Sequence, residues 1–80
     1  MTSDGIDFNI ARFLLDAQKE GRLIHSYDLI EHTLKSYSFT ELLLVICELE
    51  HDKYVQFEKE FWTLTQAGID HFFRVVEGDE

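Results

Sequence analysis

Apolar side chains recur at intervals of three and four residues near the start of the chain, the spacing that places them on one face of an α-helix. Ile10, Phe13 and Leu14 follow this spacing, which predicts a first helix over about residues 7–20. Gly21 follows at the position where a left-handed residue commonly ends a helix. A second helix is expected over about 27–35, after a short apolar pair that favours a strand.

Two hydroxyl residues predict where the next helices begin. Ser26 is expected to cap the second helix, because its hydroxyl can accept a backbone N–H that has no partner inside the helix. Ser38 and Glu41 form the pattern of a capping box, in which each side chain satisfies a backbone N–H at the other's position. A third helix is therefore expected from Ser38 to about residue 50 or 51, with an apolar stripe of Leu42, Val45, Ile46 and Leu49.

Residues 54–65 fit two interpretations. Two short runs, 55–58 and 61–64, are rich in β-branched and aromatic residues and favour a hairpin. The aromatic spacing also fits a helix, and the intervening Lys59-Glu60 lacks the Gly or Asn that a tight hairpin prefers. Periodicity does not decide between them. A last helix is expected over about 66–77 with Thr65 as its N-cap, followed by an acidic tail at 78–80.

Three stretches carry a resemblance to a known family. RLIHSYDLI (22–30) resembles a first strand that enters a second helix, and LEHDKYV (49–55) resembles a recognition helix that runs into a wing strand. FWTLTQAG (61–68) is similar to a last strand followed by the Leu-Thr-x-x-Gly motif that precedes a closing helix. In this order the stretches resemble the winged helix-turn-helix family.

The resemblance implies an α+β fold. Residues 1–80 would form a single small winged-helix domain, with a three-helix core, a short β-hairpin wing and a C-terminal helix, and its core would span about 7–76. An all-helical bundle is the alternative. Only Lys59 and Glu60 would connect the wing strands, so the wing would be stunted and its usual contact with DNA is in doubt.

The net charge of the chain limits the kinds of partner that are expected. Seven Lys and Arg stand against 16 Asp and Glu, a formal net charge of −9, which argues against unaided binding to nucleic acid or an anionic membrane. Most cations have an acidic neighbour along the chain or one helical turn away, and three of these pairs have the spacing that pairs charges on a helix: Glu31–Lys35, Arg12–Asp16 and Asp70–Arg74. Arg22 stands nearly alone.

The outward face of the third helix is the candidate interaction site. It should carry no Arg, Lys, Asn or Gln, the side chains that best recognise guanine and adenine edges. Leu44, an apolar residue amid polar ones, is a natural contact centre, unless the first helix or the hairpin covers it and the acids are only a solvated surface. The predicted face consists of Thr40, Glu41, Leu44, Glu48 and His51.

Candidate chemistry is sparse. Cys47 and His51 have a spacing that suits a metal, but two ligands do not close a site, and a buried, inert cysteine is the expectation. His32 is expected to pair with Asp28 on the helix surface. No phosphate-binding loop or nucleophile motif is present, so we expect no catalytic, cofactor-binding or metal-binding residues and no enzyme.

The aromatic residues divide into two groups. Phe13, Trp62, Phe72 and Phe73 are expected in the core. The remaining three phenylalanines, which are less clearly buried and could extend an interface, are Phe8, Phe39 and Phe61.

The single cysteine excludes an intramolecular disulfide and suits a reducing, cytoplasmic compartment. The longest apolar run, 42–47, is far below the roughly 18 residues that span a bilayer, and the N-terminus lacks the regions of a secretory signal.

The leading hypothesis is a non-enzymatic winged-helix module that acts through a protein partner with a basic surface, in a regulatory setting. One alternative is a dimeric winged-helix transcription regulator that binds DNA. Another is an acidic inhibitor of the kind found in phage or mobile elements, which presents carboxylates where phosphates would lie. Homodimerisation through the first and last helices, common in the resembled family, is left open.

Overall fold

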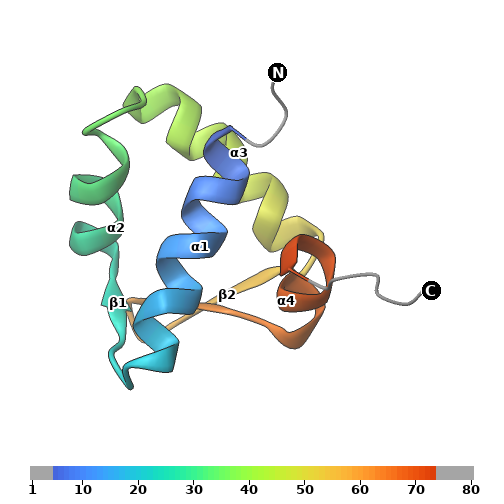
Figure 1. Ribbon diagram of the computed structural model, residues 1–80. Helices are drawn as coiled ribbons and strands as arrows, with labels where there is room; N and C mark the ends of the chain where they lie inside the picture. The colour runs from blue at the N-terminus through green and yellow to red at the C-terminus, as the bar shows by residue number, and fades with distance from the viewer. Residues whose placement is uncertain (1–4, 74–80) are drawn as a thin grey trace.

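Four helices and three short strands make up the computed structural model, which describes residues 5–73. Their order is α1 (Ile6–Lys19), β1 (Ile24–His25), α2 (Ser26–Thr33), α3 (Phe39–His51), β2 (Val55–Glu58), β3 (Phe61–Leu64) and α4 (Gln66–Phe73). The strands form one antiparallel sheet in the order β1-β3-β2. The chain is therefore a small α+β domain (Figure 1). The predicted end of the last helix, the Asp70–Arg74 pair and the acidic tail lie outside the described residues.

Helix ends follow local signals with one exception. The capping box is confirmed, because Ser38 N–H donates to Glu41 Oε1 at 2.9 Å and Glu41 N–H to Ser38 Oγ at 3.1 Å. Gly21 has the expected left-handed φ of 76°. The predicted cap at Ser26 is wrong: α2 begins one residue earlier, and His25 Nδ1 accepts the Tyr27 N–H at 3.1 Å.

Residues 55–64 form a hairpin, which excludes the helical interpretation and the all-helical bundle. Val55 pairs with Leu64 and Phe57 with Trp62, so these apolar side chains share one face of the hairpin, of which Val55 and Leu64 are buried in the core. Lys59 and Glu60 both have positive φ, 53° and 71°, as a two-residue turn of the hairpin type requires. The two strands thus impose a conformation that their turn residues adopt only at a cost.

α1 lies at the centre of the core. Ile10, Ala11, Leu14 and Ala17 are fully buried, and α1 packs against the other three helices and β3. Figure 1 shows α1 crossing α3, with the sheet at one end of α1 and α2 to one side. α3 contributes a stripe of Leu42, Ile46 and Leu49 to the same cluster, as predicted, with Val45 partly buried beside it. Within residues 5–73, no helix is both long and apolar enough to cross a bilayer.

Candidate interaction surface

The five residues predicted for the outward face of α3 are all exposed: Thr40, Glu41, Leu44, Glu48 and His51. Leu44 is 65% exposed, so neither α1 nor the hairpin covers it. The helix carries three Glu and no Lys or Arg along Phe39–His51. One of these acids, Glu41, also takes part in the capping box. The face therefore combines an accessible apolar side chain with uncompensated negative charge.

A second feature of α3, an apolar groove, was not predicted. A groove of about 180 Å³ lies between α2, the first half of α3 and β3, and Ser26 is its one polar lining residue. Phe39 and Leu43 line it from α3 while remaining 48% and 45% exposed. Of the three phenylalanines that could extend an interface, Phe39 is the exposed one. Phe8 and Phe61 are half-buried against Phe73 and His25.

Trp62 forms the hairpin side of the groove. Its indole N–H donates to Ser26 Oγ at 3.0 Å, which is the role that Ser26 has in place of the predicted cap. Phe57, directly opposite Trp62 in the hairpin, lies with its ring centre 4.6 Å from that of the indole and is 42% exposed. Trp62 is thus partly buried against the core, as are Phe13, Phe72 and Phe73, the other aromatics expected there, and its exposed part extends the apolar surface from α3 onto the hairpin.

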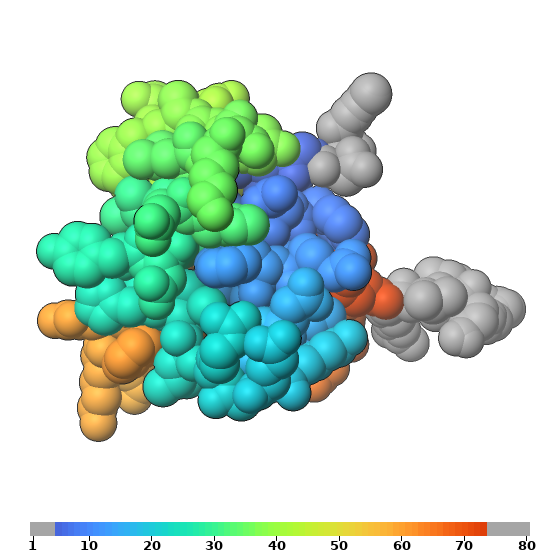
Figure 2. Space-filling view, turned by 60° about the vertical axis from the view of Figure 1, so that its left-hand side comes forward, coloured from blue at the N-terminus to red at the C-terminus, as the bar shows by residue number. Residues whose placement is uncertain are grey.

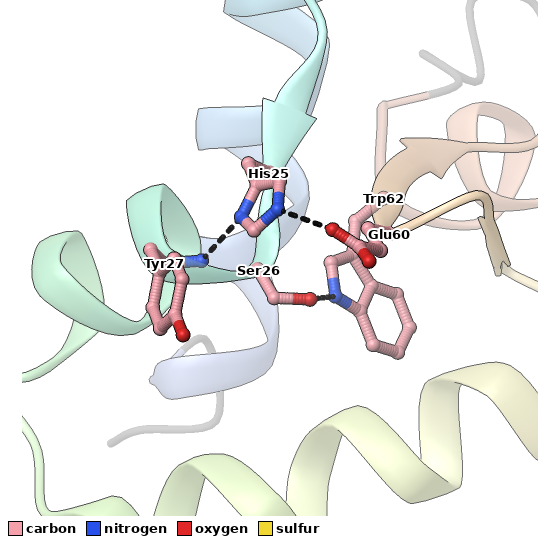
Figure 3. Close-up of polar contacts among 5 residues, drawn as sticks. All are labelled: His25, Ser26, Tyr27, Glu60 and Trp62. Atoms are coloured by element: carbon pink, nitrogen blue, oxygen red, sulfur yellow. Dashed lines mark hydrogen bonds and ion pairs between the residues drawn. The ribbon is translucent and has the colours of Figure 1, made fainter.

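A histidine joins the hairpin turn to the start of α2. His25 Nδ1 accepts the Tyr27 N–H, so the neutral ring carries its proton on Nε2, 2.9 Å from Glu60 Oε1 (Figure 3). The Ser26 N–H also donates to the Glu60 carbonyl at 3.2 Å. In Figure 3 the Trp62 indole extends from this junction toward α3. These contacts fix the separation between the hairpin and α2, and with it the width of the groove.

Neither of the two arginines within residues 5–73 lies on α3. Arg12 pairs with Asp16 at 3.4 Å, as predicted. Arg22, expected to stand nearly alone, instead pairs with Glu20 at 2.8 Å. Among residues 5–73, the predicted Glu31–Lys35 pair does not form within 4.0 Å. Both observed pairs are solvent-exposed and stabilise the fold little.

Two predictions about titratable residues are wrong. Cys47 is exposed, not buried, because it lies on the side of α3 opposite the core stripe. His32 does not pair with Asp28: its Nε2 lies 3.0 Å from Asn9 Oδ1 and its ring stacks on Phe13 at 3.9 Å. Burial lowers the pKa of His32, and the nearby Lys35 charge lowers it further. Across the described part of the chain, no three His, Cys, Asp or Glu side chains converge as a metal site would require.

No protein family, curated protein or solved structure matches this chain. The surface is therefore interpreted from its own geometry and charge.

Proposed function

We propose that this chain is a small, non-enzymatic winged-helix module that docks onto a protein partner through the outward face of α3, in a regulatory setting. The winged-helix assignment is supported by the order of the elements and by the strand order β1-β3-β2, in which the strand before α2 joins the hairpin. α3 then has the position of the recognition helix, the element that contacts DNA in DNA-binding members of the resembled family.

The observation that carries the proposal is the exposure of Leu44 on a helix without cations. Leu44 is 65% exposed, so a partner that covers it removes apolar surface from water, which stabilises the complex. The glutamates beside it would meet the phosphates of DNA, which carry about one negative charge per 1.7 Å of duplex. A protein with a basic surface presents the opposite charge and fits the same face.

The hairpin also favours a protein partner over DNA. Its turn has two residues, so the wing is short; Figure 2 shows it next to α2. Lys59 is the turn's one cation, and the other turn residue, Glu60, is bound to His25. A short wing of this charge adds little attraction to a phosphate backbone.

The test compares two variants with the same change in charge. Leu44→Arg with Glu48→Lys alters the α3 face, whereas Leu23→Arg with Asp70→Lys alters exposed residues elsewhere. In affinity purification from the source cells, we expect the first variant to lose partners that the second variant and the original chain retain. Unchanged recovery with the α3 variant would contradict the proposal.

DNA binding is the second candidate function, favoured by the position of α3 in the fold. A mobility-shift titration at low salt separates the two functions. Tight binding that weakens steeply with added salt would establish the DNA-binding alternative. The acidic-inhibitor alternative predicts that the chain competes with DNA for a basic protein, so that salt weakens the protein complex in the same steep manner.

A further inference from the structure

The groove between α2, α3 and β3 is too small for a typical small-molecule site. Its volume is about 180 Å³, whereas pockets for drug-sized ligands are usually about 300 to 1,000 Å³. Its walls are apolar, formed by Ile30 of α2, Phe39 and Leu43 of α3, and Trp62 of β3. Such a groove suits one or two apolar side chains that project from a larger partner.

The apolar surface continues beyond the groove on two sides. Phe57 extends it along the hairpin, where its ring lies beside the Trp62 indole at an angle of 37°. Tyr27, 77% exposed, and Leu34, 44% exposed, extend it along α2, because they lie one helical turn either side of Ile30. An elongated strip of this kind matches the apolar face of a helix, whose anchoring side chains recur every three or four residues.

Acidic residues border this strip. Glu50 lies one helical turn after the groove residue Ile46 on α3, and Glu31 one turn after Tyr27 on α2; both are exposed. Figure 3 shows the Glu60 carboxylate next to the Trp62 indole, with one oxygen bound to His25. A segment that lies in the groove therefore meets carboxylates on both sides of its apolar face.

We propose that the groove docks an amphipathic helical segment of another protein, with apolar side chains against Phe39, Leu43 and Trp62 and with Lys or Arg side chains beside Glu31 and Glu50. The inference rests on the proposed function, since it names the chemistry of the partner that α3 contacts. A second copy of this chain fits less well, because its net charge of −9 would bring further carboxylates to an acidic rim.

The probe is a synthetic peptide of about 18 residues, long enough to form a helix, made of Leu on one face and Lys and Ala elsewhere. Trp62 is the chain's single tryptophan, so its fluorescence reports on the groove directly. We expect a saturable change in Trp62 emission. A matched peptide with Glu in place of Lys should bind about tenfold more weakly or worse, because its charges repel the rim.

Variants of the chain test where the peptide binds. Phe39→Ser with Leu43→Ser should weaken binding about tenfold or more, while the control Leu23→Ser, which removes a more exposed leucine elsewhere, should leave it unchanged. Because Phe39 and Leu43 are half-exposed, the fold tolerates their loss, and circular dichroism checks it. Glu31→Gln with Glu50→Gln keeps the groove apolar. It should weaken binding of the Lys peptide but not of the Glu peptide.

Several results would overturn the inference: no Trp62 response, equal binding of the Lys and Glu peptides, or binding that survives the groove variants. Self-association of the chain that Leu43→Ser abolishes in sedimentation experiments would instead assign the groove to a second copy. The two proposals can also fail separately. If Leu44→Arg with Glu48→Lys loses the cellular partner but the peptide does not bind, the proposed function stands and the groove is rejected as a docking site. If the peptide binds in the groove but this variant keeps the cellular partner, the outward face is rejected.

Discussion

Gly68 shows how closely α4 is packed against the base of the hairpin. A Cβ atom at this position would overlap the Tyr54 carbonyl oxygen and lie 2.7 Å from Leu64 Cδ1. Carbon atoms in contact are normally about 3.5 to 4.0 Å apart. Gly68→Ala therefore sets two effects against each other, since alanine is the better helix former but has no room here.

The magnitudes decide the direction. Alanine in place of glycine gains about 1 kcal/mol of helix propensity. Overpacking costs about 1 to 3 kcal/mol. The Tyr54 oxygen also accepts the Thr65 N–H at 2.9 Å and the Thr65 hydroxyl at 3.0 Å, so moving α4 outward weakens two hydrogen bonds of about 1 kcal/mol each. The net result is a loss of about 2 to 4 kcal/mol, a large part of the stability of so small a domain.

Urea denaturation followed by Trp62 fluorescence measures this loss, and a thermal melt should show the midpoint fall by about 10 to 30 °C. Ala67→Gly is the matched control, because Ala67 is exposed on the same helix, so the exchange reports helix propensity without any overlap and should cost at most about 1 kcal/mol. Gly21→Ala should cost about 1 kcal/mol, because φ is 76°. A Gly68→Ala variant as stable as the original chain would refute the packing argument.

Three further predictions concern α2 and α3. Thr33→Val should raise the unfolding free energy by about 1 kcal/mol in urea titration, because the buried Thr33 hydroxyl has no hydrogen-bond partner within the described structure. Ser38→Ala should lower it by about 1 kcal/mol in the same assay, since the α3 capping box is lost. The pKa of His32 in the folded chain is lowered from 6.5, so as the pH drops the unfolded chain takes up a proton at a higher pH than the folded chain does. The free energy of unfolding should therefore fall as the pH drops through 6.5. His32→Gln should lose less stability than the original chain over about pH 8 to 5, and an equal loss in both would contradict this assignment.

Features encoded within a few residues could be predicted from the sequence. The capping box, the left-handed Gly21 and the Thr65 cap each need residues no more than three positions apart, and all three form; the last is seen in the Gly68 N–H, which donates to Thr65 Oγ1 at 3.1 Å. The hairpin could not be predicted from neighbouring residues alone. Lys59 and Glu60 carry no turn preference, and the strand pairing that selects the hairpin includes β1, about 30 residues earlier.

The groove and its supports depend on distant residues. His25 could not be predicted as a cap, because Glu60 orients its ring from 35 positions away. Ser26 is drawn from its expected cap to Trp62, 36 positions away. On α3, helical spacing places Cys47 off the core stripe, but the general tendency of free cysteines to be buried outweighed that signal. Leu43 lies off the stripe as well, and its exposure beside Phe39 is the feature that reveals the groove.

The apolar run 42–47 serves three surfaces of one helix. Leu42 and Ile46 enter the core, Leu43 lines the groove, and Leu44 faces outward. Adjacent residues on a helix are about 100° apart, so a single partner helix lying along Leu43 would leave Leu44 uncovered. A partner that covers both must be a folded surface or a pair of helices. Double-mutant cycles that combine substitutions of Leu43 and Leu44 distinguish one continuous interface from two separate partners. The two losses of binding free energy should couple when one partner contacts both residues, and should be independent when separate partners do.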